Sequence, residues 1–166
     1  MPHIYRLHRR QRLAMSLDDA WAFFSNPRNL EEITPDDLRF AIVSDVPDQI
    51  HTGLIIQYRL VVPPGIPTGW LTEIKAVEAP HRFVDEQRFG PYSLWFHEHS
   101  FRAVDGEVEC EDLVHYALPF GWLGRLAHWL FVRRQLEGIF AHRARMLAER
   151  FGEVGVAAGG SRGQVA

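Results

Sequence analysis

The sequence predicts an α+β fold in which a curved antiparallel sheet of seven strands grips one long C-terminal helix. Strand-like segments separated by turn residues fill the middle of the chain, and a proline-free stretch with helical spacing follows them. One helix can cover seven strands only if the sheet curves around it, and a curved sheet leaves space between the two layers. We therefore expect a cavity between sheet and helix.

The first part of the chain predicts a strand over residues 4–13 and then two short helices. Ser16 precedes Asp18 and Asp19, an order typical of a helix start, since acidic groups in the first turn favour the helix dipole. Pro27 ends this helix, and a second one ends before Pro35. The turn residues between the later segments indicate sequential antiparallel pairing. These strands are expected at 38–44, 54–62, 70–77, 82–88, 92–103 and 107–116.

The stretch from Trp122 to Phe151 predicts a helix of about eight turns. Its apolar residues recur at helical spacing, so they should form one stripe that lies on the sheet. Residues 152–166 show no such periodicity and are expected to form a disordered tail, which leaves one domain over residues 1–151. The predicted stripe contains Trp122, Leu126, Trp129, Val132, Leu136, Ile139, Phe140 and Leu147.

Composition excludes several classes of protein. The net charge is −3 and no basic run with interleaved aromatic residues occurs, so we expect no nucleic-acid partner. Cys110 is the single cysteine, which excludes an intrachain disulfide. No apolar stretch has the length of a signal peptide or of a membrane span, so we expect a cytoplasmic protein without membrane insertion. A protein partner cannot be assigned.

The most informative segment is the strand expected over 92–103. Side chains alternate across a strand, so Trp95, His97, His99 and Phe101 should share one face, with the two imidazoles about 7 Å apart. Histidine can exchange protons near neutral pH, ligate metals and form hydrogen bonds. A histidine pair on an aromatic face therefore indicates a site.

The same alternation places polar side chains of other strands on this inner face. Glu107, Glu109 and Glu111 share the solvent face of the last strand, so Asp112 and Tyr116 should point inward. An apolar face crossed by a few polar groups is typical of small-molecule sites. The expected polar band contains Tyr58, Thr72, Asp85, Gln87, His97, His99, Asp112 and Tyr116, and the apolar lining includes Trp70, Trp95 and Phe101.

Short motifs along residues 3–151 add a family resemblance. They are Trp21 to Leu30 followed by Ile33-Thr34-Pro35, Gly90-Pro91-Tyr92, Trp95-x-His97-x-His99-x-Phe101, Asp112 to Tyr116, and Leu118 to Gly121. In this order the motifs resemble the START-like SRPBCC superfamily, in particular its bacterial branch of small single-domain proteins of unassigned activity. The resemblance implies a helix-grip fold with a deep hydrophobic cavity. Relatives bind lipids, sterols, quinones, plant hormones or polyketides, and some are cyclases or dehydratases.

Two main functions remain open at this stage. The preferred hypothesis is binding of a small, largely hydrophobic molecule with a polar group, lipid-, quinone- or polyketide-like. Its predicted contacts are Tyr58, Trp70, Thr72, Gln87, Trp95, Phe101 and Tyr116. The alternative is a cyclase, dehydratase or hydrolase that transfers protons through His97, His99, Asp85 and Asp112. A third class, an interaction module, rests only on names given to relatives.

The histidine pair itself has three interpretations. Its nitrogens could ligate a metal together with Asp85 or Asp112, could be fixed structurally by buried carboxylates, or could contact an organic ligand. We prefer the last and expect neither metal nor cofactor. The sequence places no arginine in the cavity, which departs from the aromatic polyketide cyclase pattern.

Overall fold

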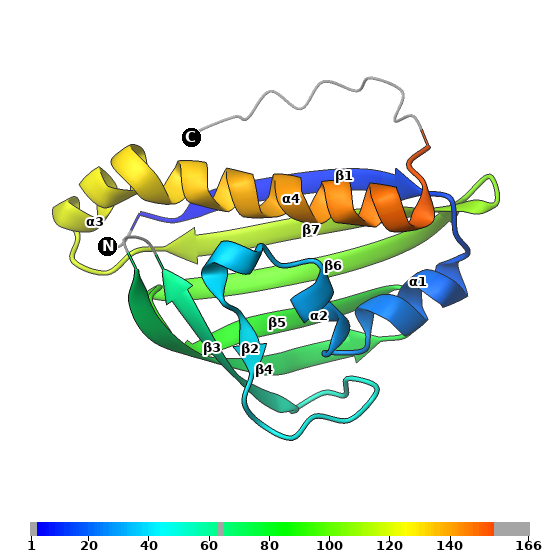
Figure 1. Ribbon diagram of the computed structural model, residues 1–166, viewed down its shortest axis with the longest axis horizontal. Helices are drawn as coiled ribbons and strands as arrows, with labels where there is room; N and C mark the ends of the chain where they lie inside the picture. The colour runs from blue at the N-terminus through cyan, green and yellow to red at the C-terminus, as the bar shows by residue number, and fades with distance from the viewer. Residues whose placement is uncertain (1–2, 63–64, 155–166) are drawn as a thin grey trace.

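The computed structural model describes residues 3–62 and 65–154, and it has the expected α+β helix-grip architecture (Figure 1). A seven-stranded antiparallel sheet in the order β1-β7-β6-β5-β4-β3-β2 curves around the C-terminal helices. Residues 155–166 of the expected tail lie outside the described residues. The strands are β1 (Tyr5–Leu13), β2 (Ala41–Ile42), β3 (Ile55–Val62), β4 (Ile66–Glu78), β5 (Arg82–Phe89), β6 (Leu94–Val104) and β7 (Glu107–Ala117).

Three short helical segments follow β1, namely α1 (Leu17–Phe24), α2 (Asn29–Glu32) and the 3-10 turn η1 (Asp36–Leu38). The Ser16 hydroxyl accepts a hydrogen bond from the backbone N–H of Asp19 at 3.1 Å and so caps α1 as expected. The strand expected over 38–44 is shortened to β2. Because η1 occupies its beginning and Arg39 then turns with a φ of 44°, extended pairing starts only at Ala41.

The inner face of the sheet has the residues that strand alternation predicts. Trp95, His97, His99 and Phe101 on β6 are all less than 9% exposed. Register shifts in β4, which are typical of bulges, bend the sheet around the core. Glu109 is a deviation, since it lies on the outer face and is nevertheless buried. Arginines cover it, with Arg102 donating to its carboxylate at 2.6 Å.

The C-terminal helical run differs from the prediction. It consists of α3 (Trp122–Ala127), a π-helical turn η2 (His128–Val132) and α4 (Arg133–Phe151). Leu136, Phe140 and Leu147 of α4 pack on the sheet, as expected. None of the helices in the described part of the chain is long and apolar enough to cross a bilayer.

The expectation that Trp122, Leu126 and Trp129 also lie on the sheet is wrong, because all three are exposed. Each residue of an α-helix turns the chain by about 100°, and a π-turn accommodates one extra residue. The stripe before η2 is therefore rotated away from the stripe of α4. Gly124 and His128 take the inward positions instead.

Candidate ligand-binding site

A cavity of about 200 Å³ lies between the inner face of the sheet and α4, and residues of α1, α2 and η1 also line it. Most of its wall is aromatic or aliphatic, and its polar side chains come from the strands and also from helices and loops. Seven of the residues predicted for the site border this cavity. They are Tyr58, Trp70, Thr72, Asp85, Trp95, His97 and His99.

The other four predicted residues face inward but do not border the cavity. Gln87 donates to the backbone carbonyl of Tyr92 at 2.7 Å and so fixes the turn before β6. Phe101 belongs to the aromatic core. The phenol of Tyr116 lies 2.8 Å from Nε2 of His128. Asp112 lies behind the histidines and contacts both of them.

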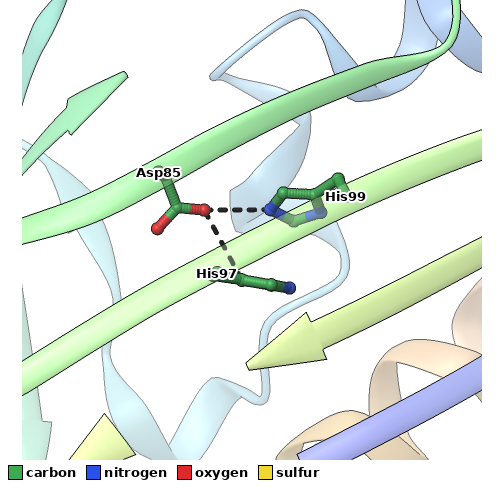
Figure 2. Close-up of side chains that lie close together, drawn as sticks. All are labelled: Asp85, His97 and His99. Atoms are coloured by element: carbon green, nitrogen blue, oxygen red, sulfur yellow. Dashed lines mark hydrogen bonds and ion pairs between the residues drawn. The ribbon is translucent and has the colours of Figure 1, made fainter. Parts of the chain in front are cut away.

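Two carboxylates from neighbouring strands enclose the histidine pair. The sheet register sets Asp85 of β5 opposite His97, and Asp112 of β7 opposite His99. Nε2 of His97 lies 2.8 Å from Oδ1 of Asp112, and Nε2 of His99 lies 2.9 Å from Oδ2 of Asp85. Nδ1 of His99 is also 3.0 Å from Oδ1 of Asp112. Figure 2 shows the Asp85 carboxylate directed at both rings.

The two imidazoles lie much closer together than their strand spacing suggests. The sequence predicts about 7 Å, the distance between alternate residues of a strand. In the structure the ring centroids of His97 and His99 are 3.7 Å apart. The rings lean together because each of them contacts both Asp85 and Asp112.

Geometry and electrostatics assign different protonation states to the two histidines. Both nitrogens of His99 lie within 3.0 Å of a carboxylate oxygen, an arrangement that favours the imidazolium form because its two N–H groups can both face acceptors. Burial, the largest influence, lowers the pKa of His99, but the hydrogen bonds to Asp112 and Asp85 outweigh it and raise the pKa overall. Burial and the neighbouring charge of His99 lower the pKa of His97. His97 is therefore the neutral member of the pair.

The two carboxylates stay ionised within this cluster. Burial alone would raise the pKa of Asp112, but hydrogen bonds from His97 and His99 hold it well below its ordinary value. Burial alone would also raise the pKa of Asp85, but the neighbouring imidazole of His97 and the hydrogen bond from His99 lower it overall. Both aspartates thus act as acceptors for imidazole N–H groups.

Arg143 of α4 is a charged residue of the cavity lining that sequence reasoning missed. Its guanidinium lies 3.6 Å from Oδ1 of Asp112. Its Nε is buried and makes no hydrogen bond with any described residue. Helical spacing could have indicated its position. Arg143 lies three residues after Phe140 and four before Leu147, and both of these residues are on the helix face that packs on the sheet. With His99 and Arg143 positive and both aspartates negative, the cluster has no net charge.

The cluster also has atoms with which it could bind a metal. One ligand atom each from Asp85, His97 and His99 lie within 4.8 Å of one another. However, each imidazole nitrogen already faces a carboxylate oxygen, and the imidazolium form of His99 has no free lone pair. Binding of a metal would therefore require loss of a proton from His99 and displacement of a carboxylate.

Three further polar side chains, all on β3 and β4, border the cavity. The indole N–H of Trp70 donates to the Thr72 hydroxyl at 3.0 Å, so this pair is satisfied within the protein. Burial, with a smaller contribution from the negative charge of Asp85, raises the pKa of Tyr58 far above its ordinary value. The phenol of Tyr58 therefore remains protonated and can act as a hydrogen-bond donor.

Solved structures of other proteins share this fold. A protein from Chromobacterium violaceum is 12% identical over 91% of this chain and 99% of its own, with a TM-score of 0.66. One from Rhodobacter sphaeroides is 22% identical over 87% and 93%, with a TM-score of 0.60. Norcoclaurine synthase from Thalictrum flavum, solved with dopamine and hydroxybenzaldehyde, is 16% identical over 89% and 88%, with a TM-score of 0.61. No protein-family model matches the chain, and neither does any curated protein sequence.

These likenesses show the fold and nothing more, because the identities are low. Norcoclaurine synthase has the SRPBCC-type fold. The chain therefore shares this helix-grip fold, which confirms the fold that the sequence motifs imply. The likeness does not assign an activity.

Proposed function

We propose that the protein binds a small, largely apolar molecule with a neutral hydrogen-bond acceptor, such as a carbonyl, in the cavity between sheet and α4. One observation carries the proposal: Arg143 borders an apolar cavity, and its Nε–H is buried without a hydrogen-bond partner among the described residues. A buried donor without a partner costs about 1 to 3 kcal/mol, and an acceptor on a ligand would remove that cost. A neutral acceptor fits because the cluster around Arg143 is already balanced in charge.

The cavity volume indicates the size of the ligand. An apolar cavity of about 150 Å³ can hold benzene, so about 200 Å³ accommodates one or two rings or a short chain. A whole lipid or sterol would require the cavity to enlarge. The compounds bound to norcoclaurine synthase, dopamine and hydroxybenzaldehyde, agree with this size in a protein of the same fold. Among the ligand classes considered, quinone-like and small polyketide-like molecules fit best.

A matched pair of probes tests the proposal. We expect 1,4-naphthoquinone to bind stoichiometrically and naphthalene, which lacks the carbonyls, to bind more weakly. In Arg143→Met the two affinities should become similar, because a hydrogen bond to a charged group contributes about 1.5 to 3 kcal/mol. Calorimetric titration gives both values. Equal binding of the two probes by the unchanged protein would contradict the assigned role of Arg143.

A second pair of variants tests the location of the ligand. Ile139→Trp adds bulk to a residue that borders the cavity, and Gly138→Trp adds bulk at an exposed position of the same helix. We expect the first substitution to abolish probe binding and the second to leave it unchanged. Native mass spectrometry of the purified protein should also show a retained small molecule, and absence of both retained and added ligand would count against the proposal.

Proton transfer is the second candidate function, and one specific observation favours it. Two adjacent histidines that both border the cavity have pKa values displaced in opposite directions. Such a pair can provide a base and an acid at the same pH. Neutral His97, whose Nε2–H donates to Asp112, would accept through Nδ1 a proton from carbon next to a ligand carbonyl, and Arg143 would stabilise the enolate oxygen.

Deuterium exchange into 2-tetralone measures this step directly. His97 removes the proton between ring and carbonyl, and return of a deuteron from D₂O restores the ketone, so no other reactant is needed. We expect exchange above the buffer rate that His97→Gln abolishes. Glu98→Gln on the outer face of β6 is the control and should leave the rate unchanged. A rate equal to that of buffer in the unchanged protein would reject catalysis of this step.

A further inference from the structure

The start of the C-terminal helical run has an apolar face directed away from the protein. Phe120, Trp129 and Phe131 are 80%, 77% and 66% exposed. With the other exposed apolar residues of α3 and η2 they make up the set that we call the end face. Its members are Phe120, Trp122, Leu123, Leu126, Trp129, Leu130 and Phe131. Figure 1 shows α3 at one end of the molecule, remote from α1.

The end face is a regular amphipathic stripe and not a scatter of exposed residues. Trp122, Leu123, Leu126, Trp129 and Leu130 follow the spacing of one helix face. In most amphipathic helices that face lies on the protein core, but here the π-turn η2 rotates it outward. A large contiguous apolar patch on a protein surface marks a place where something binds.

Phe120 supports the same conclusion independently. Its backbone has a φ of 66°, a left-handed conformation that is unfavourable for a bulky residue and is usually taken by glycine or asparagine. Its side chain gains little from packing, since it is the most exposed of the end face. A strained position that presents an aromatic ring to solvent is explained by contact with a partner.

Charge indicates the chemistry of that partner. Residues 113–136 contain Arg125, Arg133 and Arg134 and no aspartate or glutamate. Glu137 pairs with Arg133 at 3.1 Å, whereas Arg125 and Arg134 form no ion pair with any described residue. Arg125 lies three residues after Trp122 and four before Trp129, so it belongs to the end face itself.

We propose that the end face docks on an anionic lipid surface, with its tryptophans and leucines in the headgroup region and its arginines against lipid phosphates. An apolar face with tryptophan, phenylalanine and leucine beside arginine is typical of helices that lie in the membrane interface. A symmetric pair of copies joined through this face would bring arginines together without any acidic residue to balance them. The lipid surface therefore fits better than a second copy.

This proposal stands independently of the cavity and its ligand. It does concern the route by which an apolar molecule could enter the cavity from a bilayer. Three residues of the cavity wall, Gln135, Leu136 and Ile139, follow the end face within about two helical turns. Docking would place that wall next to the bilayer.

Co-sedimentation with vesicles tests the proposal on the full chain. We expect binding to vesicles of equal parts phosphatidylcholine and phosphatidylglycerol, weaker binding to phosphatidylcholine alone, and loss of the difference at high salt. Trp122→Ser and Trp129→Ser should each reduce the partition coefficient by about tenfold or more. Arg125→Gln should reduce it about fivefold on anionic vesicles only.

Phe89→Ser provides the matched control. Phe89 is 69% exposed but lies at the end of β5, outside the end face, so its variant should bind vesicles like the unchanged protein. All substituted side chains are exposed, and thermal unfolding will show that the variants fold. Failure of the unchanged protein to bind anionic vesicles at low salt would overturn the proposal. The proposal would also be overturned if light scattering showed a concentration-dependent dimer that Trp129→Ser dissociates, and if the protein did not bind vesicles.

Discussion

Replacement of Asp112 by asparagine is the sharpest test of the buried cluster. Asp112 lies 2.8 Å from His97, 3.0 Å from His99 and 3.6 Å from Arg143. The Asp112→Asn substitution keeps the shape of the side chain and removes its charge. The positive charges of His99 and Arg143 would then face Asp85 as the remaining carboxylate of the cluster.

The expected cost follows from the burial of this charge balance. Removal of one partner from a buried ion pair destabilises a protein by about 3 to 5 kcal/mol. We expect Asp112→Asn to lower the free energy of unfolding by about 3 kcal/mol at neutral pH. This is the lower end of the range, because His99 can release its proton and so reduce the charge imbalance. In a domain of this size that corresponds to a decrease in melting temperature of about 6 to 12 °C.

Glu111→Gln is the matched control, one residue away on the outer face of β7. Its carboxylate pairs with Arg10 at 3.1 Å and with His8 at 2.6 Å, and it is 32% exposed. Surface pairs of this kind contribute about 0 to 1 kcal/mol, so the free energy of unfolding of Glu111→Gln should be close to that of the unchanged protein.

Urea unfolding followed by circular dichroism provides the free energies, with the slope against urea checked for constancy. If Asp112→Asn and Glu111→Gln lost equal stability, the reasoning about a buried charge network would be refuted. A second check uses Arg143→Met as the background. There Asp112→Asn should lower the free energy of unfolding by less, because one of the two positive charges that Asp112 balances has been removed.

Other expected outcomes concern pH, helix packing and metal. The pKa of His99 is raised in the folded protein, so protonated His99 stabilises the fold. This contribution is complete below the unfolded-state pKa of about 6.5 and is lost as the pH rises through the folded-state pKa. The urea midpoint should therefore decline over this pH range in the unchanged protein and not in His99→Gln. Gly124→Ala should destabilise by about 1 to 3 kcal/mol in thermal melts, since its Cβ would lie 2.2 Å from the Pro119 carbonyl oxygen, and unchanged stability would disprove this packing. Gly138→Ala has open space around its Cβ and should stabilise the helix by about 0.5 to 1 kcal/mol in the same assay. Elemental analysis of protein purified without added metal should find no stoichiometric transition metal, and one equivalent would favour the metal interpretation.

Strand alternation made much of the site predictable. Period-two parity on β6 and β7 indicated that His97, His99 and Asp112 share one face, and the structure brings them together. Parity cannot show how deep a side chain lies, which is why Gln87, Phe101 and Tyr116 face inward without reaching the cavity. The 3.7 Å contact of the two rings was not predictable either, since it depends on hydrogen bonds from two other strands.

Sequence alone thus determined the order of the elements, the inner face of each central strand and the histidines and aspartates that meet in the candidate site. Strand parity is a local property, so a misplaced strand end does not alter it. Helix phase accumulates along the chain, and the single π-turn η2 was enough to turn Trp122 and Trp129 from the sheet to the surface. The tertiary structure also placed Arg143 against Asp112, a contact between α4 and β7 that sequence spacing does not specify. Its position completes the charge balance of the cluster.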